Sequence, residues 1–147
     1  MIIPDANLLL YAYDAASPFH AKASDWWRRC LTGRSPVGLC PVVLFAFVRI
    51  GTSRRAFEEP MTIEEASRHV RSWLEMPSTH LLPQEESDVI RALDWLVLQG
   101  VGGNLTTDAQ IAATALRTRA EVHTADADFS RFPGVKWVNP LFARSAD

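Results

Sequence analysis

The sequence lacks a surplus of positive charge. Its 147 residues include 15 Lys and Arg against 17 Asp and Glu, which gives a formal net charge of -2 at pH 7. A protein that coats RNA or DNA without specificity needs a broadly basic surface, so this class is disfavoured. An enzyme with a local basic rim around an acidic site remains compatible with this balance.

Cysteines and long apolar runs are also scarce. Cys30 and Cys40 have neither metal-ligand spacing nor the density of a secreted disulfide scaffold, so we expect two reduced thiols. The most apolar stretch, 37–48, is too short to span a bilayer and ends at Arg49. The first residues carry no basic segment typical of a signal peptide. We therefore expect a cytoplasmic protein with no membrane partner.

The composition and the order of elements predict one α/β domain. Hydrophobic residues make up 48% of the chain and charged residues 22%, and no repeat or linker interrupts it. Short apolar strands alternate with amphipathic helices, which is typical of a parallel sheet covered on both faces. The predicted strands are 1–4, 37–40, 79–82, 121–124 and 135–138. The predicted helices are 8–14 (capped by Asn7), 17–30, 41–50, 62–75, 85–99 and 106–119, with a single turn over 126–129.

Three acids are expected to meet at one edge of this sheet. Asp5 and Asp126 each follow a predicted strand, and the carboxyl ends of parallel strands border the usual functional crevice. Asp108 lies in the first turn of a helix, on the face that packs towards the sheet. Crowded carboxylates are favourable only with a cation, and oxygen ligands suit Mg²⁺ or Mn²⁺. Each acid also has a structural interpretation, as a helix cap, a first-turn acid or a turn residue.

Several motifs resemble those of the PIN-domain family, in particular toxin ribonucleases of the VapC type. The segment Ile3-Pro4-Asp5-Ala6-Asn7-Leu8-Leu9-Leu10-Tyr11-Ala12 is similar to the opening of these proteins. Asn104-Leu105-Thr106-Thr107-Asp108-Ala109 resembles their third acidic motif, and Thr124-Ala125-Asp126-Ala127-Asp128-Phe129 resembles the fourth. The resemblance covers about residues 1–142, which we take as the domain, with 143–147 as a C-terminal tail.

The resemblance implies both a fold and a function. The fold would be a PIN-like three-layer sandwich around a mostly parallel sheet, often dimeric. The activity would be Mg²⁺- or Mn²⁺-dependent cleavage of RNA, commonly tRNA or ribosomal RNA, restrained by a VapB-like antitoxin. Asp5, Asp108 and Asp126 would be the catalytic and metal-binding acids. Asp128 would be an accessory carboxylate, and Asn7 and Thr124 would order the site through hydrogen bonds.

One position departs from the family pattern. The family's second acid is usually a glutamate in the helix after the second strand, and Ala46 occupies that place here. The chain is then an engineered inactive variant, a natural degenerate PIN domain, or an enzyme for which three acids suffice. A degenerate domain would bind RNA or an antitoxin without cleaving.

The remaining expectations concern binding surfaces and rival classes. Arg49, Arg54 and Arg55 would either contact RNA phosphates or form a solvated helix end and loop. The region of Leu8 to Ala12 and Trp26-Trp27 is a candidate groove for an antitoxin helix or a second subunit. A phosphoacceptor domain and a phosphatase of the haloacid dehalogenase type both fit poorly. The first lacks an acid after Leu81-Leu82, and the second would need an aspartate where Asn7 stands.

Overall fold

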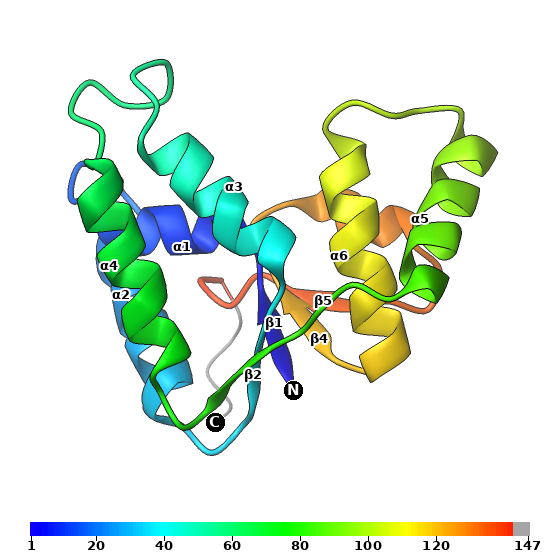
Figure 1. Ribbon diagram of the computed structural model, residues 1–147, viewed down its shortest axis with the longest axis horizontal. Coiled ribbons are helices and arrows are strands. Elements are labelled where there is room, and N and C mark those ends of the chain that lie inside the picture. The colour runs from blue at the N-terminus through cyan, green and yellow to red at the C-terminus, as the bar shows by residue number, and fades with distance from the viewer. Residues whose placement is uncertain (143–147) are drawn as a thin grey trace.

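Five three-residue strands form one sheet at the centre of the molecule (Figure 1). The structure is a computed structural model that describes residues 1–142. The strand order is β3-β2-β1-β4-β5, and every neighbouring pair is parallel. The strands are β1 (Ile2–Pro4), β2 (Val37–Leu39), β3 (Thr79–Leu81), β4 (Glu121–His123) and β5 (Lys136–Val138). The sheet is therefore fully parallel over the described residues.

Helices cover both sides of this sheet. In Figure 1, α1, α2 and α4 lie on one side and α5 and α6 on the other, while α3 packs against α1, α4 and α6. The helices are α1 (Ala6–Tyr13), α2 (His20–Thr32), α3 (Pro41–Gly51), α4 (Ile63–Leu74), α5 (Glu86–Gln99) and α6 (Leu105–Thr118), with a 3₁₀ turn η1 (Ala127–Arg131). This arrangement confirms the predicted three-layer α/β sandwich. Within residues 1–142, no helix has the length and apolar character needed to cross a bilayer.

The core consists of the sheet and the helix faces turned towards it. Ile3, Val37 and Val122 are completely buried, as expected for central strands of a sheet covered on both sides. On the α1, α2 and α4 side, Phe47 and Trp73 pack edge to face with ring centroids 4.8 Å apart. The tryptophans on this side thus serve packing, which is the usual role of aromatic residues at helical spacing.

The helix starts differ slightly from the predicted ones, and the caps give the reason. Helix α1 begins at Ala6 because Asp5, rather than Asn7, is the N-cap and accepts a hydrogen bond from the Ala6 amide. Helix α2 begins at His20, later than Ser17-Pro18 suggested, because Ser17 binds the Phe19 amide in a turn before the helix. The predicted stop of α5 at Gly100 is confirmed by its left-handed backbone, with φ of 67°. The tail predicted over 143–147 lies outside the described residues.

The chain crosses from one side of the sheet to the other between β3 and β4. As a result β4 pairs with β1, with Ile3 opposite Val122 and Pro4 opposite His123. The Asp5 amide continues this ladder by donating to the His123 carbonyl at 2.9 Å. The residues that follow β1 and β4 are therefore neighbours, at the point where α/β sheets commonly bind ligands.

Helix α5 presents an apolar face to solvent. Its core-facing side buries Asp88, Ala92 and Trp95, and a second stripe at helical spacing remains exposed. The exposed stripe, called here the α5 face, consists of Val89, Ile90, Leu93, Val97 and Val101. Contiguous apolar surface of this kind commonly marks an interface.

Candidate metal centre

Asp5 is buried at the junction of β1 and α1, with 6% of its surface exposed. Its Oδ1 accepts from the Ala6 amide at 2.7 Å, and its Oδ2 accepts from the Thr124 hydroxyl at 2.8 Å. Burial raises the pKa of Asp5, and the charge of Asp126 adds to the rise, while the bonds from Thr124 and Ala6 lower it. Asp5 thus both caps α1 and contributes a carboxyl group to the crevice.

Thr124 and Asn7 connect the ends of β1 and β4. The Thr124 hydroxyl accepts from the Asp126 amide at 2.9 Å while it donates to Asp5. The Asn7 side chain donates to the same hydroxyl at 3.4 Å and accepts from the Ala125 amide at 3.3 Å. Both residues predicted to order the site therefore take part in one hydrogen-bond network around its acids.

Three further carboxylates converge in front of this network. Asp108, Asp126 and Asp128 each offer an oxygen, and these oxygens all lie within 4.8 Å of one another. Asp108 comes from the first turn of α6, and the other two flank the start of η1, where Asp126 Oδ1 caps the Asp128 amide at 2.8 Å. Asp5 is not part of this close set, although its charge reaches Asp108. The structure thus brings together four predicted acids from three separate segments.

The electrostatics of the cluster are those of a site that needs a cation. Burial, together with the charges of Asp5, Asp126 and Asp128, raises the pKa of Asp108 to about 8. Hard divalent ions take carboxylate oxygens as ligands, and a cation placed among these groups would remove the repulsion that favours the protonated form. Donor type and spacing therefore fit Mg²⁺ or Mn²⁺.

The other predicted positions lie on α3 and in the loop that follows it. Ala46 is buried on α3, with 7% of its surface exposed, and α3 packs against α1 after Asp5 and against α6. Arg49, Arg54 and Arg55 are exposed at and beyond the end of α3. Among residues 1–142, no hydrogen bond or ion pair connects these arginines to the acids.

One buried ion pair was not predicted from the sequence. Asp88 of α5 is 1% exposed, and Arg117 of α6 donates from Nε to both of its oxygens, at 2.9 and 3.1 Å. The sequence contained a signal for Asp88 alone, because Glu85 and Asp88 have the spacing of a capping box, which they form at the start of α5. The pairing with a residue 29 positions away left no local trace in the sequence.

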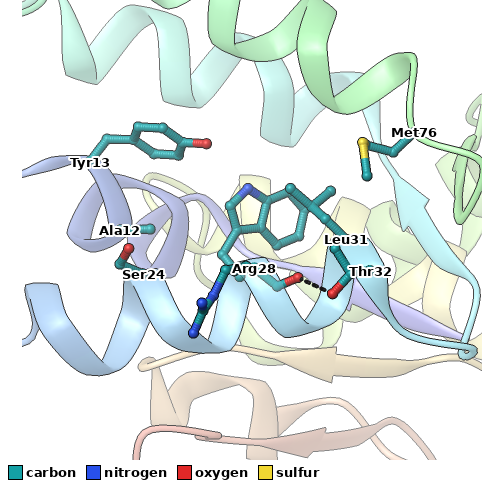
Figure 2. Close-up of a pocket in the computed structure, with 8 residues that line it drawn as sticks. Ala12, Tyr13, Ser24, Arg28, Leu31, Thr32 and Met76 are labelled. Carbon is teal, nitrogen blue, oxygen red and sulfur yellow. Dashed lines mark hydrogen bonds between the residues drawn. The ribbon is translucent and has the colours of Figure 1, made fainter.

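A cavity of about 220 Å³ opens on the opposite side of the sheet, between α1, α2 and the end of α4. Tyr13 and Met76 face it from two sides, with Leu31 and Thr32 of α2 along its wall (Figure 2). Trp27 also lines it, and its indole Nε1 is buried without a hydrogen-bond partner among the described residues. Leu8 and Leu9, expected in a groove here, are instead fully buried in the core.

Comparisons with known proteins agree with this geometry. The family model of the PIN domain matches residues 2–135. Ribonuclease VapC33 of Mycobacterium tuberculosis is 42% identical over 141 residues, covering 96% of this chain and 99% of that protein.

Two solved structures share the fold at low identity. The first, M. tuberculosis VapC20, described as a sarcin-ricin loop cleaving toxin, has a TM-score of 0.68 at 18% identity, covering 92% of this chain and 99% of that one. The second, a toxin-antitoxin complex from Klebsiella pneumoniae, has a TM-score of 0.62 at 17% identity, covering 95% and 98%. Family match, near full-length relatives and the acidic crevice together establish that this chain belongs to the PIN-domain family, among relatives of the VapC type.

Proposed function

We propose that this chain is a Mg²⁺- or Mn²⁺-dependent endoribonuclease and the toxin of a VapBC-like toxin–antitoxin pair. The observation that carries the proposal is the convergence of Asp108, Asp126 and Asp128 within 4.8 Å, beside Asp5, at the carboxyl edge of the sheet. The 42% identity to a protein named a ribonuclease supports RNA as the substrate.

In this proposal each residue of the crevice has a distinct task. Asp5, Asp108 and Asp126 hold the ion, and Asp128 is an accessory acid near it. When bound, the ion supplies Lewis-acid chemistry that activates water and stabilises negative charge on the phosphodiester. Thr124 and Asn7 keep the two strand ends in register, so that the acids are preorganised before the ion arrives. Cleavage then displaces the 3′ oxygen of the RNA backbone.

The substrate would approach along the end of α3. Arg49, Arg54 and Arg55 are exposed there and carry planar guanidinium groups that bind phosphate oxygens well. We propose them as contacts for the RNA backbone of a tRNA or ribosomal RNA. They would supply the local positive rim that a chain of net charge -2 lacks overall.

Ala46 supports a second candidate function. Because the resemblance has glutamate at this place, the acidic site is one carboxylate short, and divalent binding should be weaker. A PIN domain in this condition would bind RNA or an antitoxin without cleaving. The same position distinguishes the two functions, because a glutamate can be introduced there.

The test is cleavage of total tRNA and ribosomal RNA with added Mn²⁺. The wild-type chain is compared with Ala46→Glu and with a double variant that adds Asp126→Asn. If Ala46→Glu cleaves, the double variant should lose at least about 100-fold in rate, since an interaction of the transition state is removed. Asp94→Asn, an exposed acid of α5, is the matched control and should leave the rate unchanged.

Each outcome decides between the functions. Cleavage by the wild-type chain shows that the acids present suffice. Cleavage that appears only with Ala46→Glu shows a nuclease whose second acid is missing here. No cleavage by either folded protein on several RNAs favours the binding function and contradicts the enzyme.

We further propose an antitoxin as the partner of the cavity between α1, α2 and α4. The largely apolar walls suit a segment that brings an apolar side chain. The Klebsiella toxin-antitoxin complex of the same fold supports a partner of this class. At the rim of the cavity Arg28 forms an ion pair with Asp25, with its Nη2 2.6 Å from Asp25 Oδ1.

A second copy of the chain is the proposed partner of the α5 face. Four apolar side chains of α5 and that of Val101, just beyond its C-cap, make up this face and are between 41% and 81% exposed. A two-fold contact would bury this stripe against itself. We propose that the assembly works in the cytoplasm, a compartment that suits an RNA substrate, an antitoxin partner and reduced thiols.

A further inference from the structure

The ion pair between α5 and α6 engages the whole Arg117 guanidinium. Besides the two bonds from Nε to Asp88, Nη1 lies 3.2 Å from Glu85 Oε1, and Nη2 donates to the Pro83 carbonyl at 3.3 Å. All three nitrogens thus have partners on the segment that leads into α5. A planar group bound in this way has one permitted orientation.

Asp88 receives a second donor from the same helix. The Thr114 hydroxyl of α6 donates to Asp88 Oδ2 at 3.3 Å, and the Glu85 amide donates to the same oxygen at 3.0 Å. Thr114 and Arg117 are three residues apart and therefore share one face of α6. One buried carboxylate thus sets both the rotation of α6 and its position along its axis.

Elsewhere on the buried face of α6, Leu105 and Ile111 are the large apolar side chains, and the other apolar side chains are small. Small side chains form shallow ridges, so they fix the rotation and axial position of a helix less firmly than a directed ion pair does. These small side chains are Ala109, Ala112, Ala113 and Ala115. Meanwhile the first turn of α6 brings Asp108 to within 4.8 Å of the carboxylate oxygens of Asp126 and Asp128.

We propose that the Arg117–Asp88 pair positions the metal site, by holding α6 in the register that brings Asp108 to Asp126 and Asp128. This inference rests on the proposed metal-dependent function. Both residues are positioning residues, because they contact neither the acids nor the substrate. Arg117 lies nine residues from Asp108, or roughly 13 Å along the helix.

The pair should affect metal affinity rather than the chemical step. If it is lost, α6 relaxes and the ion must draw Asp108 back, so the Mn²⁺ affinity should fall by about tenfold or more. At saturating Mn²⁺ the ion itself restores the geometry, and the rate of RNA cleavage should return to the wild-type value. A purely structural role would change the melting temperature without changing the metal requirement.

Two variants separate position from stability. Arg117→Lys keeps the charge and loses the planar fork. The double variant Asp88→Leu with Arg117→Met replaces the pair by apolar groups, a change that often leaves stability unharmed. Arg29→Gln removes an arginine from the exposed pair with Asp25 on α2 and is the matched control. Mn²⁺ binding is followed by electron paramagnetic resonance, stability by thermal melting, and α6 by amide hydrogen exchange in metal-free buffer.

The expected result is a folded double variant with weak Mn²⁺ binding and faster exchange of the amides at 108–112, while Arg29→Gln behaves as wild type. Wild-type Mn²⁺ affinity together with unchanged α6 exchange in either folded variant would overturn the proposal. If the wild-type chain binds no Mn²⁺, the proposed metal function fails. The exchange comparison is made without metal, so it still decides whether the pair holds α6.

Discussion

At the scale of single residues, Asp108 links protonation to stability. Its ordinary pKa of 3.8 is raised to about 8, above all by burial and then by the surrounding acids. Between these pH values the folded protein holds a proton that the unfolded chain has released. The free energy of unfolding of the metal-free protein therefore falls as the pH rises from about 4 to about 8.

Asp108→Asn should remove this penalty. In the presence of EDTA at pH 8 we expect the variant to be more stable than wild type by roughly 2 kcal/mol, with a difference that shrinks as the pH is lowered towards 4. Excess Mn²⁺ should stabilise the wild-type chain at pH 8 and have little effect on the variant. Urea unfolding at several pH values measures both effects, with Asp94→Asn as control. A variant less stable than wild type at pH 8 in EDTA would contradict this account.

The arrangement of the acids was predictable because it depends on local rules. The predicted strand ends gave the positions of Asp5 and Asp126, and helical spacing predicted that Asp108 faces the sheet. Their roles in metal binding and catalysis stay predictions. The cap of the first helix was predicted at Asn7, with Asp5 as the alternative, because both residue types cap helices well and only one residue separates them. Asp88 and Arg117 escaped prediction because their pairing depends on how two helices pack.

At the scale of elements, the cavity between α1, α2 and α4 has a testable wall. Trp27→Phe replaces the indole by a smaller ring and removes part of this wall. If the antitoxin packs an apolar side chain against the wall, its affinity should fall by about 3- to 10-fold. Isothermal titration of the cognate antitoxin measures the change. Trp95→Phe, on α5 at the other side of the sheet, is the control and should bind normally.

Equal antitoxin affinity of wild type and Trp27→Phe would show that the partner does not pack against this wall. A loss that is just as large with Trp95→Phe would point to general destabilisation. In either case the cavity would lose its role as the site of specific recognition. The antitoxin itself would then be sought on another face.

The order and type of the elements were predictable from periodicity, and the contents of the layers were not. Each of the five strands and six helices was expected within a few residues of its observed bounds. Leu8 and Leu9 were expected in a groove and lie in the core, since an apolar run of α1 is buried on more than one side. Which side of a short helix is covered depends on its neighbours, and local sequence does not encode them.

At the scale of the whole molecule, the α5 face predicts self-association. Leu93→Glu or Val97→Glu should convert a dimer into a monomer, because a charge would be buried at the centre of the contact. Ile63→Glu places the same charge on an exposed apolar residue of α4 and should leave the dimer intact. Sedimentation velocity distinguishes the species. A wild-type chain that sediments as a monomer at high concentration would refute the dimer.

The central place of β1 has a consequence for the time at which the crevice forms. Asp5 is synthesised well before its spatial neighbours Thr124 and Asp126. A growing chain that ends before β4 has no partner for one edge of β1 and lacks Thr124, Asp126 and Asp128 altogether. Contacts over such sequence separations form late and slowly. Whatever this crevice does, it begins to do it only after synthesis has passed Asp128.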